Sequence, residues 1–302
     1  MSGPAISIRG LTKRYGRLTA VKNLAFDVQE GEIFGFLGLN GAGKTTTIRI
    51  LLDLLRPNAG TASVLGHDCQ GAGLHARSAI GYLPGEAGLY GDMTGREVLD
   101  LMGRLQVRGV EPQYRRRLQE RLELSDADLR RKLREYSTGM KRKLCLIQAF
   151  QSDPPLLILD EPTEGLDPLM QESFYNLLSE VRSRGRTVFM SSHVLSEVVR
   201  MCERIGLIRK GELALLSSVE SLHRMAQRRV RISFGSDVTA RPEGLPADYE
   251  VVEFAPRSWH FTVRGALGPL IAALAGLPVL DVDVEEARLE EVLIRYYREE
   301  KA

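Results

Sequence analysis

The segment from Gly38 to Thr46, GLNGAGKTT, constrains the fold of this 302-residue chain more than any other part of the sequence. It matches the pattern G-x-x-x-x-G-K-[ST], with Gly38, Gly43, Lys44 and Thr45 at the fixed positions. The apolar run EIFGFLG precedes it, and a helical pattern, TTIRILLDLLRP, follows it and is expected to stop at its proline. A strand, a glycine-rich turn and a helix in this order predict a phosphate-binding loop in an α/β domain.

The loop indicates how a nucleotide would be held. Its glycines let consecutive backbone amides turn toward phosphate oxygens, Lys44 reaches the β and γ phosphates, and the Thr45 hydroxyl binds Mg²⁺. We therefore predict a catalytic role for Lys44 and nucleotide contacts from Gly38, Asn40, Gly41, Ala42, Gly43, Lys44, Thr45 and Thr46.

A second motif, LLILDEP, runs from Leu156 to Pro162. A fully apolar strand of this kind delivers the carboxylates at its end to the edge of an open α/β sheet where ligands bind. Asp160 is predicted to hold Mg²⁺, directly or through water, and Glu161 to orient or deprotonate the attacking water. The alternative is that both acids only cap the next helix.

Four motifs taken together resemble those of ATP-binding cassette (ABC) proteins. In chain order they are GLNGAGKTT, YSTGM, LILDEPTEGLD and SSH, and the resemblance covers residues 5 to about 215. It implies a P-loop NTPase of the ABC type: an α/β fold with a mixed sheet core and a helical subdomain. The expected cofactors are ATP and Mg²⁺.

The resemblance also implies a paired arrangement. Two cassettes face each other head to tail, and each ATP lies between the phosphate loop of one and the signature turn of the other. Ser137 and Gly139 would then contact a nucleotide bound by a second chain, although Ser137 could also be an ordinary helix cap.

Three further residues acquire roles from the resemblance alone. Tyr15 corresponds to the aromatic residue that stacks on adenine. A tyrosine in a strand is more often part of a core, but Tyr15 is expected to lie before the strands, and this place favours stacking. His193 corresponds to the catalytic histidine that contacts the γ-phosphate, although a histidine after a strand is more often structural. Asp167 corresponds to the residue that communicates across the dimer.

The chain departs from the family pattern at three places. The signature is YSTGM where the family has LSGGQ, and Glu164 replaces a small residue. In IGYLPGEAGLY, Gly85 stands where the family usually has a glutamine that ligates Mg²⁺, and Glu86 is the adjacent candidate. We expect these departures to affect coupling to transport more than ATP binding.

The sequence predicts two domains. Residues 1–218 form the ATP-binding domain, with a helical subdomain at about 88–152, and residues 219–302 form a small C-terminal α+β domain with a last helix at 288–297. This C-terminal domain resembles the extension of ATPases that serve drug, antibiotic and polysaccharide exporters.

Composition narrows the function further. With 41 Lys and Arg against 39 Asp and Glu, the chain lacks the positive excess of a nucleic-acid binder, so no nucleic-acid partner is expected. The basic runs Arg115–Arg117 and Lys141–Lys143 are interpreted as solvated faces. Cys145 and Cys202 are interpreted as core thiols in a reducing compartment.

We predict an ATP-hydrolysing subunit of an exporter that works as a homodimer or beside a paired ATPase subunit. No signal peptide or membrane-spanning segment is predicted, so its permease would be a separate integral membrane protein, and the chain would lie on the inner face of the cell membrane. The alternative is a soluble ABC ATPase that acts on ribosomes or DNA. The transported molecule is not predicted.

Overall fold

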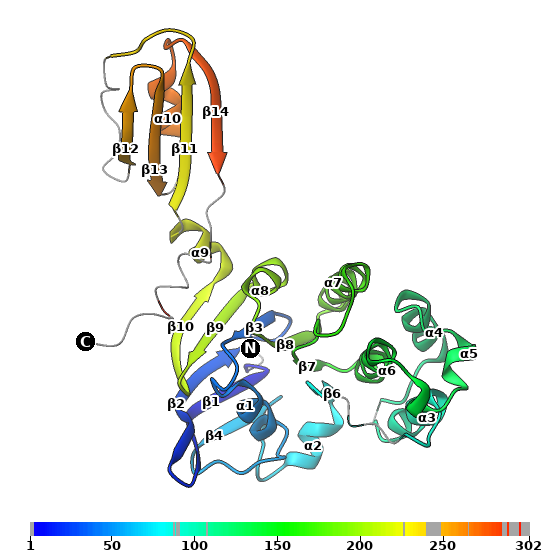
Figure 1. Ribbon diagram of the computed structural model, residues 1–302. Helices are drawn as coiled ribbons and strands as arrows, with labels where there is room; N and C mark the ends of the chain where they lie inside the picture. The colour runs from blue at the N-terminus through cyan, green and yellow to red at the C-terminus, as the bar shows by residue number, and fades with distance from the viewer. Residues whose placement is uncertain are drawn as a thin grey trace. The chain divides into compact units, whose positions relative to one another are not determined.

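The computed structural model describes residues 3–86, 88, 91–106, 108–225, 227–239, 249–264, 266–285, 289 and 296. The chain divides into two compact units, Met1–Leu216 and Ser217–Ala302. Each unit has its own sheet and core (Figure 1).

The first unit contains two sheets (Figure 1). One has the strand order β2-β1-β4-β5 and antiparallel pairing. Its strands are β1 (Ile6–Tyr15), β2 (Leu18–Val28), β4 (Ala59–Val64) and β5 (His67–Asp68). The other has the order β10-β9-β3-β8-β7-β6, and the pairs from β9 to β6 are parallel. Its strands are β3 (Ile33–Leu37), β6 (Ile80–Leu83), β7 (Leu156–Asp160), β8 (Thr187–Ser192), β9 (Arg204–Arg209) and β10 (Glu212–Ser218). This arrangement confirms the predicted α/β class with a mixed sheet core.

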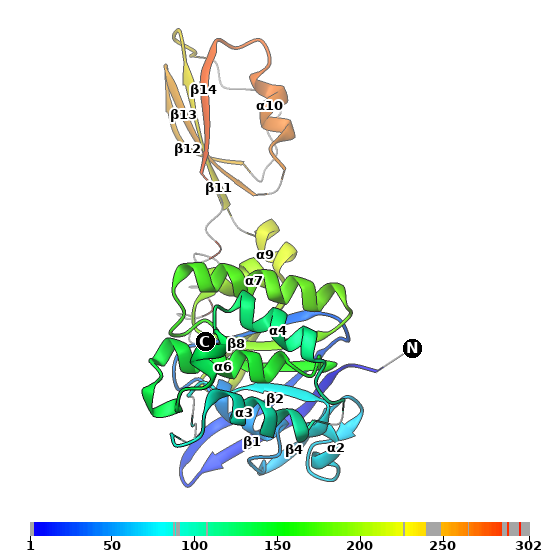
Figure 2. The ribbon, with the colours of Figure 1, turned by 90° about the vertical axis from the view of Figure 1, so that its right-hand side faces the viewer.

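Helices cover both faces of the larger sheet. Figure 1 shows α1 between the two sheets and α7 and α8 on the opposite side of the larger one. Figure 2 brings α3, α4, α6 and α7 to the front together. The helices of this unit are α1 (Lys44–Leu51), α2 (Gly73–Ser78), α3 (Gly95–Arg104), α4 (Pro112–Arg121), α5 (Asp126–Leu129), η1 (Leu133–Glu135), α6 (Thr138–Phe150), α7 (Pro168–Ser183) and α8 (Leu195–Met201).

The strands β3 and β7, on either side of β8, are almost wholly apolar because they are covered on both faces. Every residue of both strands is buried, including Asp160 at the end of β7. Stacked rings join the two sheets: the Phe26 and Phe34 ring centres lie 5.3 Å apart, and those of Phe34 and Phe189 lie 5.8 Å apart. This core fixes the carboxyl end of β3, where the phosphate loop begins, and the carboxyl end of β7, which carries Asp160 and Glu161.

Two local predictions are wrong. The helix after the phosphate loop ends at Leu51 rather than at Pro57, because the chain turns at Asp53, which has a left-handed φ of 53°. Aspartate tolerates this conformation better than most residues. Tyr15 was expected before the strands, but it is the last residue of β1, where the hairpin to β2 begins.

The second unit is a four-stranded antiparallel sheet with the order β12-β13-β11-β14 and a core around Trp259. Its elements are α9 (Val219–Met225), β11 (Gln227–Phe234), β12 (Tyr249–Ala255), β13 (Ser258–Arg264), α10 (Gly268–Leu274) and β14 (Val279–Glu285). The helix predicted at 288–297 lies outside the described residues, apart from 289 and 296.

Two further findings concern the described residues of both units. None of their helices is long and apolar enough to cross a membrane. All three cysteines are buried and free, and burial raises the pKa of the Cys145 thiol to about 11.

Candidate functional site

The phosphate loop leaves the end of β3 and turns directly into α1. Gly38 and Gly43 are dictated by close packing: a Cβ on Gly38 would lie 2.7 Å from the Ile208 carbonyl oxygen, and one on Gly43 would lie 2.5 Å from that of Ala20. Gly43 also has a left-handed φ of 115°. No side chain caps α1, so its first amides are free to bind an anion.

Lys44 is buried, and its ammonium group has three partners. Nζ donates to the carbonyl oxygens of Gly38 at 2.5 Å and Leu39 at 3.4 Å, and it pairs with Glu161 Oε1 at 3.1 Å. The lysine therefore bridges the phosphate loop and the end of β7.

At the end of β7, Asp160 and Glu161 are held by Ser191 of the neighbouring strand β8. The Ser191 hydroxyl donates to Asp160 Oδ1 at 2.5 Å and accepts from the Glu161 backbone N–H at 3.0 Å. Glu161 adopts a left-handed φ of 49°, which is uncommon for a residue with a side chain. The Asp160 carboxylate is therefore held by Ser191, whereas the turn at Glu161 points the Glu161 carboxylate in another direction.

His193 completes the arrangement. Its Nδ1 lies 2.8 Å from Glu161 Oε2, and its backbone N–H donates to the same oxygen at 3.3 Å. An ionised carboxylate can only accept, so Nδ1 carries the proton in this contact. Lys44, Glu161 and His193 were predicted from three separate motifs. In the structure, Lys44 and His193 contact the two carboxylate oxygens of Glu161.

Glu161 also borders a pocket of about 810 Å³. Asn40 and Thr45 line it from the phosphate loop, and Asp160 and Glu161 line it from β7. Gly85 and Glu86 also line it, and a Cβ on Gly85 would lie 3.5 Å from Asp160 Oδ2. Gly85 therefore lies beside Asp160. A residue with a side chain at position 85 would contact the Asp160 carboxylate.

The pocket suits Mg²⁺ bound together with a nucleotide. The hydroxyl of Thr45 and the carboxylate of Asp160 are hard oxygen donors, which Mg²⁺ prefers. Among the described residues no group of three or more His, Cys, Asp or Glu could hold a metal alone. In nucleotide sites Mg²⁺ usually takes further ligands from phosphates and water.

Apart from Asn40, Thr45, Asp160 and Glu161, the predicted site residues do not line this pocket. Tyr15 is 46% exposed at the end of β1, so it is not a core residue. Ser137 caps α6, accepting from the Met140 N–H at 3.2 Å, and Gly139 follows it. Asp167 caps α7, accepting from the Met170 N–H at 2.9 Å.

The interpretation of Lys141–Lys143 as a solvated run is wrong for its central residue. Arg142 is only 4% exposed, and its guanidinium donates to backbone carbonyls at the ends of β6 and β7. Its helical spacing from the buried Cys145, Leu146 and Ala149 could have revealed this.

Two other residues were not identified from the sequence. Ser191 is part of the SSH motif, but its bonds depend on the pairing of β7 with β8. Glu197 of α8 accepts from the Thr163 hydroxyl at 2.7 Å and the Ser192 hydroxyl at 3.1 Å. Nothing in the sequence places Glu197 beside them.

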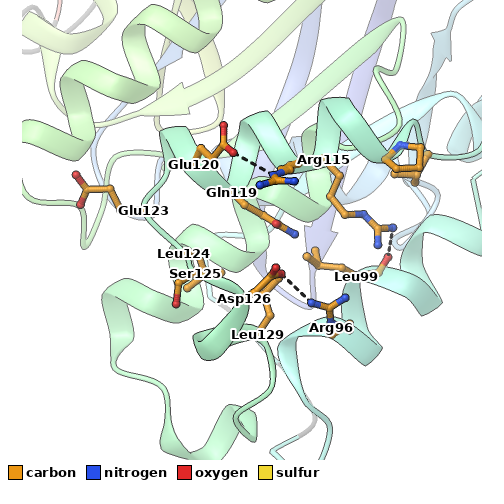
Figure 3. A pocket seen from close by; sticks show the side chains of 13 residues that line it. Arg96, Leu99, Arg115, Gln119, Glu120, Glu123, Leu124, Ser125, Asp126 and Leu129 are labelled. Carbon is orange, nitrogen blue, oxygen red and sulfur yellow. Dashed lines mark hydrogen bonds and ion pairs between the residues drawn. The ribbon is translucent and has the colours of Figure 1, made fainter.

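A second pocket of about 710 Å³ lies among α3, α4 and α5 (Figure 3). Its charged walls are paired: Arg96 with Asp126 at 2.7 Å, Arg116 with Glu120 at 3.2 Å, and Arg115 with Asp100. No predicted site residue lines it. The chemistry predicted from the motifs therefore belongs to the first pocket.

The fold and the first pocket define a P-loop nucleotide hydrolase. Its phosphate loop and its acidic strand end belong to the same α/β sheet. Comparisons with known proteins specify the family. The ABC transporter family model matches residues 21–164. The Nod factor export ATP-binding protein I of Burkholderia orbicola (strain AU 1054) is 35% identical over 98% of this chain and 97% of that protein.

Two further matches agree. The daunorubicin resistance ATP-binding protein DrrA3 of Streptomyces coeruleorubidus is 37% identical over 74% of this chain and 71% of that protein. A solved ATP-binding subunit of an ABC transporter is 28% identical, with a TM-score of 0.67, and covers 73% of this chain and 92% of that chain. The chain belongs to the ABC transporter ATP-binding proteins and is an ATPase of that family.

Proposed function

We propose that this ATPase drives export through a separate integral membrane permease, and that it works as a homodimer or beside a similar ATPase subunit on the inner face of the membrane. The observation that carries its role in hydrolysis is the contact of one carboxylate, Glu161, with both Lys44 and His193. The match to a protein named for Nod factor export supports the direction of transport, because it extends over nearly the whole chain, including the second unit.

Lys44 and Glu161 are expected to change partners when ATP binds. In the structure the ammonium group neutralises the carboxylate across 3.1 Å. Phosphate oxygens would compete for Lys44, and the amides at the start of α1 would bind them as well. Glu161 Oε1 would then be released to accept a proton from water.

His193 is expected to hold Glu161 in place. When the ring carries a proton on each nitrogen, Nδ1 can donate to Glu161 while Nε2 donates to a γ-phosphate oxygen, so one ring can link the base to the reacting phosphate. Thr45 and Asp160 would hold Mg²⁺, which supplies positive charge to the phosphates during transfer.

Ser137, Gly139, Asp167 and Tyr15 are proposed to act in the pair of cassettes. The first three would contact the nucleotide or the partner across the interface, and Tyr15 would stack on adenine. The room beside Gly139 supports this assignment, because a Cβ there would meet its nearest atom, the Gly165 carbonyl oxygen, only at 3.7 Å.

Copurification tests the export proposal. A tagged Glu161→Gln variant is expressed in the native cell, membranes are solubilised gently with Mg·ATP, and the bound proteins are identified. A multispanning membrane protein is the expected partner. Ribosomal or DNA-bound partners in a membrane-free fraction would instead establish the soluble ATPase alternative.

A further inference from the structure

Arg142 occupies an unusual place in this site. It belongs to α6, five residues after the cap Ser137, and its side chain is buried. Among the described residues no carboxylate oxygen forms an ion pair with it within 4 Å. Burial lowers the pKa of the guanidinium, and the acids Glu164, Asp160 and Glu161 oppose this effect only in part. A buried cation of this kind must be stabilised by other dipoles.

Five backbone carbonyl groups supply them. Nη1 donates to Pro84 O at 2.7 Å and Gly85 O at 3.1 Å, both just beyond β6. Nη2 donates to Asp160 O at 3.0 Å and to Glu161 O, and Nε donates to Pro162 O at 3.4 Å. One planar group therefore holds the ends of two neighbouring parallel strands side by side.

The bond to Glu161 has a specific consequence. Glu161 has a left-handed φ of 49°, and this turn sets the direction in which its carboxylate leaves the strand end. Ser191 holds the Glu161 N–H from one side, and Arg142 holds its carbonyl from the other. Both backbone polar groups of an uncommon conformation are thus fixed by neighbouring side chains.

We propose that Arg142 is a positioning residue for hydrolysis: it fixes the turn at Glu161 and the adjacent Gly85 segment, and so ties the orientation of the catalytic carboxylate to the helix that carries the signature turn. This inference rests on the proposed role of Glu161 as the base. Lysine cannot replace the arginine, because an ammonium presents its donors at a single point and cannot span two strand ends.

The test uses the full-length chain with Arg142→Lys and, as a matched control, Arg115→Lys. Arg115 is also a largely buried arginine of the helical segment that donates to a backbone carbonyl, that of Leu99, at 3.2 Å, but it lies at the second pocket. We expect Arg142→Lys to lower kcat about 100-fold, as small displacements of a catalytic group do. The Kd for Mg·ATP should change less than about threefold, because the phosphate loop is intact. Arg115→Lys should leave kcat near the wild-type value.

A double-mutant cycle separates positioning from a general structural role. If Arg142 acts through Glu161, adding Arg142→Lys to the Glu161→Gln variant should lower kcat by less than about threefold. Equal costs in both backgrounds would overturn the inference. If Arg142→Lys does not fold, Arg142→Ala is assayed with millimolar guanidinium chloride, which should restore part of kcat; no recovery in the folded variant would also overturn it.

The two proposals fail differently. A wild-type chain that does not hydrolyse ATP, alone or with its partners, would overturn the role of Glu161 and the inference together. A wild-type chain that hydrolyses ATP beside an equally active Arg142→Lys variant would overturn the inference alone.

Discussion

The phosphate loop and the signature turn both place a glycine at the start of a helix, yet the two helix ends are built differently. At the start of α1 no side chain caps the helix, and Gly43 is pressed against the Ala20 carbonyl. At the start of α6 the Ser137 hydroxyl caps the Met140 N–H. A Cβ on Gly139 would fit there without a clash.

This difference separates requirements that arise inside the chain from those that arise outside it. Packing and backbone conformation within one molecule explain Gly43 completely. Neither explains Gly139, because its φ is not among the positive values and a Cβ there meets nothing closer than 3.7 Å. A glycine without a reason in its own chain is expected where another molecule approaches closely. The following predictions test this contrast.

The largest effect on activity is expected from Glu161→Gln, which removes the carboxylate paired with Lys44 of the phosphate loop. Removing the proposed base should lower kcat about 1,000-fold, within the range for general-base catalysis, while ATP binding is retained. Steady-state ATPase assays and equilibrium nucleotide binding measure the two quantities. Glu120→Gln, which removes the same charge from an exposed position on α4, is the matched control. A Glu161→Gln variant as active as the wild type would refute the assigned role.

Gly43→Ala should destabilise the first unit by about 3 kcal/mol, because it combines a clash with a backbone carbonyl and a left-handed φ. Gly41→Ala is the control: Gly41 has a φ of 79° but nothing within 4 Å of a Cβ, so about 1 kcal/mol is expected. Hydrogen exchange of α1 in urea is the suitable probe, since the single tryptophan, Trp259, reports on the second unit. Equal costs for both variants would show that the clash is relieved.

Ser137 can be tested by substitutions that separate its cap from its proposed partner contact. Aspartate retains the cap but places a negative charge where the γ-phosphate of a second chain would lie, and alanine removes the cap at a cost of about 1 kcal/mol. We expect Ser137→Asp to fold like the wild type, to bind ATP as a monomer, and to lose roughly tenfold or more in cooperative turnover. Normal turnover in Ser137→Asp would reduce Ser137 to a helix cap, and lost monomer binding would contradict the cross-interface account.

Short-range patterns were sufficient to predict much of this site. Asp160 ends the apolar strand β7, Glu161 follows it, and Lys44 stands at the end of the loop after β3, so their place at one edge of a parallel sheet could be inferred from local sequence. Long-range contacts could not be inferred in the same way. For example, β4 is a segment of small residues that becomes a strand by pairing with β1, which lies more than 40 residues earlier in the chain.

Arg142 shows where a local interpretation failed although the information was present. A basic run is usually solvated, but the spacing of Arg142 from Cys145 and Leu146 places it on the buried side of α6. What the sequence could not reveal is the set of carbonyl groups from β6 and β7 that makes burial of its charge tolerable.

The smallest effect on stability is expected from Gly139→Ala, and it isolates the contrast most cleanly. Alanine fits beside Gly139 and is the better helix former, so the free energy of unfolding of the first unit should stay equal or rise by up to about 1 kcal/mol. If a second chain's nucleotide approaches this glycine, ATP-dependent dimerisation and turnover should nevertheless fall, and sedimentation with the Glu161→Gln background would measure the dimer directly. Because the variant remains folded, such a loss could only arise at the interface. Unchanged dimerisation and turnover would mean that the glycine is as dispensable between chains as it is within one, and the contrast between the two helix ends would lose its functional meaning.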